Sequence, residues 1–249
     1  MPEDRSAVLW GLVAAQAAAA GHRVSVADVC AVAARSAEVS GGWVAAAGGR
    51  GPDFVICVTD PVSEQLAELQ LTLGEGPCYD VLASGGPVLA VDLGDEEFAR
   101  RWPGFARQAR LLGAGAVFAF PLAIGAIQAG VMGMYRSSAG LLPWERFGDA
   151  LTLADLATVL LLDGLGHGDG GPAPWPALDG QSPDLALHRA EIDQATGMLT
   201  VQLGLPVAEA YARLRAYAYV QDRRLADVAR DIVARRLRLQ DDPGGDGGP

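Results

Sequence analysis

Residues 164–184 constrain the fold of this chain most strongly, because they continue neither of the regular segments that flank them. The segment reads GLGHGDGGPAPWPALDGQSPD, and its glycines, prolines and aspartates leave it without a helical or strand-like hydrophobic period. We therefore expect a linker that divides the 249 residues into two domains, at 1–163 and 185–239. The remaining residues, 240–249, predict a disordered acidic tail.

Charge is distributed unevenly between these parts. Residues 1–184 contain ten Arg and twenty-one acidic residues, whereas residues 185–239 contain nine Arg and six acidic residues. The net charge is therefore −11 in the first part and +3 in the second, and the last ten residues add three Asp. Because an acidic body repels polyanions, any nucleic-acid site is expected within 185–239.

Several classes of protein lack support in the sequence. The three cysteines are widely spaced and form no CxxC or Cys/His pattern, which argues against a disulfide framework and against a metal site. No Ser/His/Asp set, paired carboxylates or phosphate loop is present, so we expect neither an enzyme nor a bound cofactor. The uncharged stretch between Arg110 and Arg136 contains glycines and Pro121, and fits two buried strands better than a membrane span. We expect a cytoplasmic protein.

The N-terminal domain predicts an α+β fold, in which helices flank a mostly antiparallel sheet. Strands are expected at 43–47, 53–58, 87–91, 117–120 and 130–135. Helices are expected at 6–20, 25–39, 98–112 and 143–162. Ser25 is placed to cap the second helix, and Asp60 is placed to cap a further helix that begins with Pro61.

The C-terminal domain predicts an all-α bundle of three amphipathic helices. In the first helix, residues of one face recur three and four apart, as in a heptad seam: Leu185, His188, Ile192, Ala195, Leu199 and Gln202. Gly204 and Pro206 end this helix, and two helices with single apolar stripes follow. The heptad spacing of the first helix predicts a homodimer, with His188 as an interface residue.

Residues 185–239 resemble the ANTAR domain, an RNA-binding three-helix module of bacterial transcription antiterminators. The motif IDQATGML at 192–199 and the pairs Leu214-Arg215 and Val228-Ala229 carry this resemblance. The N-terminal part is similar to a GAF domain, through LGEGPCYD at 73–80 and RWP at 101–103. Together they imply a signal-responsive regulator: the GAF-like domain senses a ligand or partner, and the ANTAR domain binds RNA stem-loops in transcription antitermination.

The resemblance implies RNA contacts by Arg189, Gln194, Thr196, Gly197, Arg215, Arg223 and Arg224. Arginine suits this role because it both neutralises phosphate and stacks on bases. Thr196 stands where the family usually has Lys, so one cation is missing and only a hydroxyl remains to reach RNA. Gly197 costs about 1 kcal/mol relative to Ala inside a helix, which a close approach of another backbone or a nucleotide would explain. Arg235, Arg236 and Arg238 are interpreted as a solvated surface.

In the GAF-like domain the candidate ligand-binding residues are Trp43, Cys78, Phe118 and Phe120. The three aromatic residues would line a cavity under the GEGPC loop, and Cys78 would act through redox or thioether chemistry. The alternative is that the aromatic side chains form plain core and that Cys78 is a buried structural thiol.

Two alternative functions remain open from the sequence. The departure at Thr196 and the small positive excess favour a sensory or protein-interaction module with degenerate RNA binding. Binding of double-stranded DNA by a helix-turn-helix is less favoured, because a first helix built as a dimer seam is poorly placed to read a groove.

Overall fold

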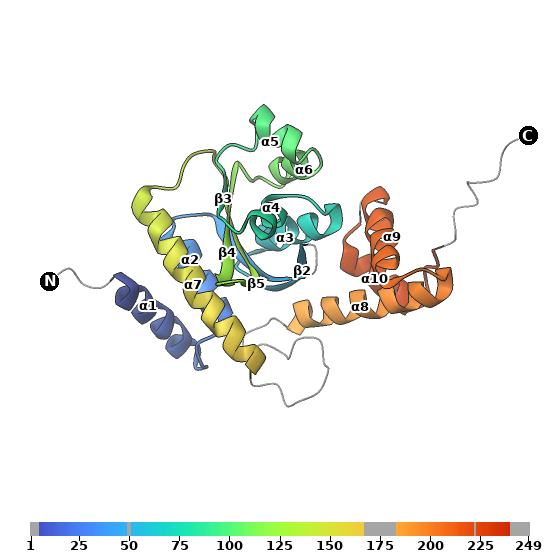
Figure 1. Ribbon diagram of the computed structural model, residues 1–249, viewed down its shortest axis with the longest axis horizontal. Helices are drawn as coiled ribbons and strands as arrows, with labels where there is room; N and C mark the ends of the chain where they lie inside the picture. The colour runs from blue at the N-terminus through green and yellow to red at the C-terminus, as the bar shows by residue number, and fades with distance from the viewer. Residues whose placement is uncertain (1–4, 49–50, 167–182, 222, 240–249) are drawn as a thin grey trace, which may run out of the picture. The chain divides into compact units, whose positions relative to one another are not determined.

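The computed structural model describes residues 5–48, 51–166, 183–221 and 223–239 (Figure 1). The chain divides into two compact units, Met1–Ala186 and Leu187–Pro249. Most of the predicted linker and the whole of the predicted acidic tail lie outside the described residues.

The N-terminal unit is built around one antiparallel sheet of five strands in the order β2-β1-β5-β4-β3. Its strands are β1 (Gly41–Ala47), β2 (Pro52–Val58), β3 (Val88–Ala90), β4 (Ala116–Ile124) and β5 (Ile127–Arg136). Its helices are α1 (Arg5–Ala20), α2 (Val26–Ser36), α3 (Pro61–Leu73), α4 (Pro77–Ser84), α5 (Glu96–Arg101), α6 (Phe105–Leu111) and α7 (Trp144–Gly166). The predicted α+β class is confirmed. None of the helices in the described part of the chain is long and apolar enough to cross a membrane.

Helices cover both faces of this sheet (Figure 1). On one face α2 and α7 pack over a core that contains Phe118 and Met132. On the other face α3 and α4 pack over a core that contains Trp43 and Val117. Because successive side chains of a strand point to opposite faces, the neighbours Val117 and Phe118 belong to different cores.

Two helix starts follow from local sequence signals and are confirmed. Ser25 and Asp28 form a capping box at α2, in which each side chain accepts a hydrogen bond from the backbone N–H of the other residue. Asp60 caps α3, and its Oδ1 accepts hydrogen bonds from the backbone N–H groups of Val62 and Ser63 at 2.9 and 3.0 Å.

The structure differs from the predicted elements in two places. The single helix expected at 98–112 is two helices, α5 and α6, because Trp102 leaves helical geometry (φ −134°, ψ 74°) ahead of Pro103. A further helix that was not among the expected elements, α4, begins at Pro77 directly after Gly76, which has a φ of 128°.

Asp60 also joins the start of α3 to the sheet. Its Oδ2 accepts hydrogen bonds from the hydroxyls of Thr59 at 2.8 Å and Ser63 at 2.5 Å, and Tyr135 donates to its Oδ1 at 3.1 Å. A Cβ at Gly41 would lie 1.8 Å from that Oδ2, so glycine is required at this point of β1. Burial acts to raise the pKa of Asp60, but the hydrogen bonds outweigh burial and lower it.

This cluster predicts a loss of stability in acid. The folded pKa of Asp60 lies below its unfolded value of about 3.9. Its ionised form therefore stabilises the fold above that pH, and this contribution to stability disappears as the pH falls through the folded pKa. Asp60→Asn keeps a capping acceptor but cannot ionise. Urea unfolding should therefore give a lower free energy of unfolding for Asp60→Asn at neutral pH, and the difference should shrink as the pH falls through the folded pKa of Asp60. A difference that stays constant with pH would contradict this assignment.

The C-terminal unit contains a bundle of three helices, as predicted. These are α8 (Pro183–Leu203, which begins in the N-terminal unit), α9 (Val207–Val220) and α10 (Leu225–Val233). Their apolar stripes meet in one core, whose fully buried side chains include Ala195, Leu199, Leu214 and Val228. Gly204, with a φ of 66°, ends α8, and Pro206 directly precedes α9.

The bundle explains the heptad-like spacing of α8. Ala195 and Leu199 are fully buried in the core of their own chain. The Gln202 side chain donates a hydrogen bond of 2.8 Å to the backbone carbonyl of Leu239 in the same unit. These three seam residues therefore offer no support for a dimer, and the homodimer stays a prediction.

Candidate nucleic-acid interface

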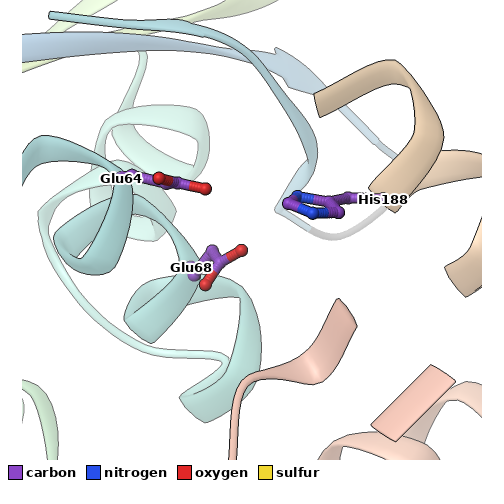
Figure 2. A group of neighbouring side chains, drawn as sticks. All are labelled: Glu64, Glu68 and His188. Carbon is purple, nitrogen blue, oxygen red and sulfur yellow. The ribbon is translucent and has the colours of Figure 1, made fainter. Parts of the chain in front are cut away.

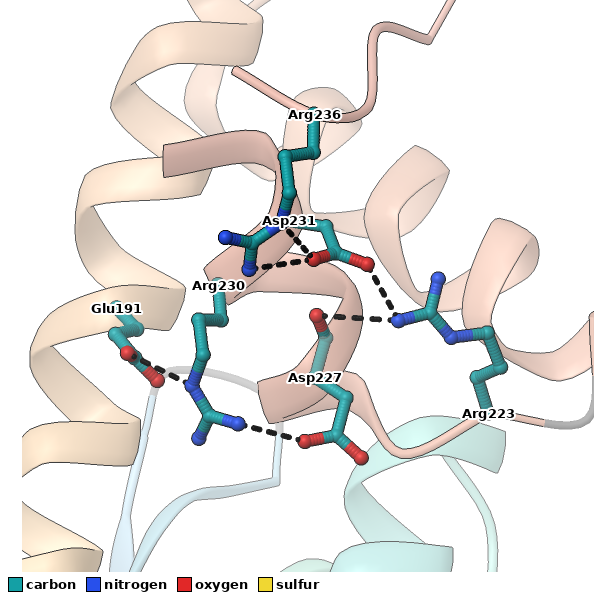
Figure 3. Close-up of polar contacts among 6 residues, drawn as sticks. All are labelled: Glu191, Arg223, Asp227, Arg230, Asp231 and Arg236. Carbon is teal, nitrogen blue, oxygen red and sulfur yellow. Dashed lines mark hydrogen bonds and ion pairs between the residues drawn. The ribbon is translucent and has the colours of Figure 1, made fainter. Parts of the chain in front are cut away.

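Two arginines of the C-terminal unit share one carboxylate (Figure 3). Arg223 donates to Oδ2 of Asp231 at 2.7 Å, and Arg236 donates to Oδ1 of Asp231 at 2.8 Å. These two guanidinium groups lower the pKa of Asp231, so it is ionised at neutral pH. Asp231 therefore offsets part of the positive charge that Arg223, a predicted RNA contact, would present.

Arg230 connects two helices of the bundle. It donates to Glu191 of α8 at 3.1 Å and to Asp227 of α10 at 3.0 Å (Figure 3). The Glu191 side chain is only 14% exposed, so its charge needs this partner. Arg230 thus has a structural role in holding α8 against α10.

Three further predicted contacts come from different helices. Arg189 of α8 lies 3.8 Å from Asp193, one turn along the same helix. Arg215 of α9 lies over the ring of Tyr211, with its Cζ 5.7 Å from the ring centroid. Arg224 is the residue that precedes α10.

Thr196 does not present its hydroxyl to a ligand. The residue is buried, at 6% exposure, and its Oγ1 donates a hydrogen bond of 2.7 Å to the backbone carbonyl of Ile192. The geometry therefore does not support the predicted contact between this hydroxyl and RNA, because the donor is already used inside α8.

Gln194 and Gly197 lie together in a groove with a volume of about 770 Å³. The groove lies between α8 and the segment that follows α10. Its apolar lining consists of Met198, Val201, Ile232 and Leu237, and its polar lining consists of Gln194, Gln202, Arg235 and Arg238. A Cβ at Gly197 would meet no described atom within 4 Å, so no backbone of the described chain explains this glycine.

Arg235 and Arg238, interpreted from the sequence as solvated surface, both line this groove. Within the described ranges neither side chain has a hydrogen-bond or ion-pair partner. Arg235 adopts a left-handed conformation, with a φ of 57°, at the position after α10 where glycine is usual.

Residues 186–233 match the family model of the ANTAR domain. The C-terminal unit carries an ANTAR domain. The match confirms the resemblance, and all seven residues expected to contact RNA fall inside the matched range. No curated protein matches the chain.

Solved structures similar to this chain include two GAF domains of phosphoenolpyruvate-protein phosphotransferases. The one from Acinetobacter is 13% identical, with a TM-score of 0.48, over 68% of this chain and 100% of its own. The one from Coxiella burnetii is 12% identical, with a TM-score of 0.49, over 65% of this chain and 96% of its own. A domain of a putative two-component sensor histidine kinase from Sinorhizobium meliloti is 14% identical, with a TM-score of 0.43, over 54% of this chain and 86% of its own. These similarities are too low to assign a function to the unit that precedes the ANTAR domain.

The four candidate ligand-binding residues of the N-terminal unit do not converge on one cavity. Trp43 and Cys78 are buried on the face that α3 and α4 cover, and Phe118 and Phe120 are buried on the face that α2 and α7 cover. The prediction that Trp43, Phe118 and Phe120 line one cavity is therefore wrong, because the sheet separates Trp43 from the two phenylalanines. Burial also raises the pKa of the Cys78 thiol to about 12, which fits a structural thiol.

The GEGPC block connects to the RWP block through hydrogen bonds. Glu75 Oε1 accepts from the backbone N–H groups of Gly104 and Phe105 at 2.7 and 2.8 Å, which caps the start of α6. Asp80 Oδ2 accepts from Arg101 Nε at 2.5 Å and Trp102 Nε1 at 3.0 Å. The two sequence blocks that carry the GAF resemblance therefore hold each other in place.

Glu64 and Glu68 lie one turn apart on α3 (Figure 2). His188, drawn in the same figure, belongs to α8 and to the ANTAR domain. Because the carboxylates and the imidazole belong to different units, we assign metal binding to none of them.

Proposed function

We propose that this protein is a signal-responsive, non-catalytic regulator that binds RNA stem-loops through its ANTAR domain in transcription antitermination. The family match over residues 186–233 is the observation that carries the proposal. The charge distribution supports it, because residues 185–239 contain nine Arg against six acidic residues in an otherwise acidic chain.

Six of the nine arginines in residues 185–239 fall into two groups. Arg223, Arg230 and Arg236 are paired with acidic residues of the domain itself. Arg213, Arg235 and Arg238 are exposed and pair with nothing else in the described parts of the chain. The unpaired group is available to phosphate without the loss of an existing ion pair, so we expect it to contribute most to affinity.

Replacing Asp231 with asparagine is expected to raise RNA affinity. The change removes one negative charge and releases Arg223 and Arg236, which the carboxylate holds. Because opposite charges attract most strongly at low ionic strength, affinity should rise about fivefold at low salt. Retardation of stem-loop RNA by the full-length protein at several salt concentrations measures this, and the salt dependence should steepen.

Asp155→Asn is the matched control, because it removes the same charge from an exposed position on α7. It should leave RNA affinity unchanged. Equal gains in both variants would mean that net charge alone sets the affinity. Absence of binding to stem-loop RNA by the wild-type protein, even at low salt, would refute the proposed function.

A second candidate is a sensory or protein-interaction module whose ANTAR domain binds RNA weakly. The observation in its favour is Thr196, which supplies no cation and whose hydroxyl is bonded to Ile192. The same salt series separates the two candidates, since a degenerate domain would gain little from Asp231→Asn.

We further propose that the N-terminal unit senses a ligand or a partner, as its GAF-like motifs imply, and that the full-length protein is a homodimer. Sedimentation of the full-length protein with and without stem-loop RNA tests the second point. The seam of α8 does not support the dimer at Ala195 and Leu199, which the bundle core buries.

A further inference from the structure

Two residues of the groove, Gly197 and Arg235, are each found in a backbone conformation that costs them more free energy than it would cost the other residue type. Gly197 lies inside α8, where glycine is less stable than other residues, and Arg235 has a left-handed φ of 57°, where glycine is preferred. Neither position is explained by packing, since a Cβ at Gly197 would touch nothing among the described atoms and Arg235 is exposed. Residues kept in unfavourable conformations commonly mark a ligand site.

The groove also has the chemistry of a base-binding site. Its lining is apolar at Met198, Val201 and Ile232, which suits the flat face of a nucleobase. The side-chain amide of Gln194 offers both a donor and an acceptor to a base edge. No acidic side chain is among the residues that line the described groove, and two arginines are, so its charge is complementary to phosphate.

The wall formed by the segment after α10 is held by the bundle itself. Gln202 of α8 donates a hydrogen bond of 2.8 Å to the carbonyl of Leu239, and the Leu239 side chain is buried in the bundle core. Backbone N–H groups of Arg236 and Leu237 donate to the carbonyl of Asp231 at 2.8 and 3.1 Å. The groove is therefore formed before any ligand binds, which lowers the entropic cost of binding.

We propose that this groove binds one unstacked base of an RNA loop, with Arg235 and Arg238 contacting the phosphates on either side of it. The inference rests on the proposed RNA binding and adds the place where the loop is read. Its volume of about 770 Å³ falls within the range of about 300–1,000 Å³ that is usual for small-ligand sites. Gly197 adds no side chain to the groove, and the left-handed residue Arg235 lies in the segment that forms its other wall.

The test uses the full-length protein and a pool of RNA hairpins with a constant stem and a randomised loop. A hairpin that the wild-type protein binds is then prepared with each loop base replaced, one at a time, by an abasic nucleotide. One position should weaken binding by about tenfold, the loss expected for a stacked base. The remaining positions should have smaller effects.

Two variants connect that base to the groove. Gly197→Leu fills the groove with a better helix former, and Arg235→Gly relieves the left-handed residue and removes one cation. Both should unfold at or above the wild-type temperature, yet bind the intact hairpin about tenfold more weakly. In Gly197→Leu the abasic substitution should cost little more, because the base has already lost its site. If Gly197 and Arg235 had only a structural role, replacing them would not raise the stability of the protein and lower its RNA affinity together.

Arg213→Gln is the matched control, because it removes one unpaired cation from the exposed surface of α9, outside the groove. It should weaken binding without changing the cost of the abasic position. If the groove variants bind the hairpin as tightly as the wild type, the groove does not hold a base, while RNA binding by the ANTAR domain stands. If no hairpin in the pool binds the wild-type protein, the proposed function fails and this inference fails with it.

Discussion

Replacing Leu214 with alanine is expected to unfold the ANTAR domain and abolish RNA binding. Leu214 is fully buried at the centre of the three-helix core. Loss of a buried leucine side chain costs about 2–5 kcal/mol, and a core of this size rarely supplies more than about 3–5 kcal/mol in total. The variant should therefore be largely unfolded in this domain at ordinary temperatures.

The tryptophans allow the two units to be followed separately. All five lie before residue 176, and the ANTAR domain has none. In Leu214→Ala, circular dichroism should report a loss of helix while tryptophan fluorescence keeps its wild-type transition. Val220→Ala, at a side chain of α9 that is 74% exposed, is the control and should unfold like the wild type. A change in tryptophan fluorescence at the transition of the ANTAR domain would show that the units do not unfold independently.

Replacing Phe120 with alanine is expected to destabilise the N-terminal unit by about 3–5 kcal/mol, the usual cost of removing a buried phenylalanine. Its ring is fully buried between the sheet and α7, with its centroid 5.7 Å from that of Phe147. Since a domain is stable by only about 5–15 kcal/mol, the tryptophan transition should move to much lower urea concentrations.

Ile124→Ala on the same strand is the matched control for this loss. Ile124 is 50% exposed, so its replacement should change the free energy of unfolding little. The comparison also separates the two interpretations of Phe120. A Phe120→Ala variant with wild-type stability would contradict the core assignment and favour a ligand-lining role.

Short-range sequence signals predicted the local structure of this protein correctly. Ser25 and Asp60 begin helices as expected, because a capping side chain bonds to backbone groups two or three residues away. The three apolar stripes of the ANTAR domain predicted its bundle for a similar reason, since the helical period of apolar residues is a property of one segment. The two differences from the predicted elements also have local causes. Pro103 follows the end of α5, and Pro77 begins α4.

The candidate site could be predicted only in part. Gln194 and Gly197 were identified from the family motif and do lie in one groove, whereas Arg235 and Arg238 were missed. Their place depends on how the chain turns after α10 and on the hydrogen bond that ties Leu239 to α8. Such contacts join residues far apart in sequence, and no spacing rule reveals them.

The sequence by itself determined the two-part organisation, the charge asymmetry and the ANTAR motif, because composition and periodicity are carried by consecutive residues. The tertiary structure decided which side chains meet. The register of β1 against β5 places Trp43 opposite Gly133, on the face away from Phe118. Folding of the bundle pairs Arg223 and Arg236 with Asp231 and leaves Arg235 facing a groove. The physical reason is that burial and ion pairing depend on distances between segments, which only the folded chain sets.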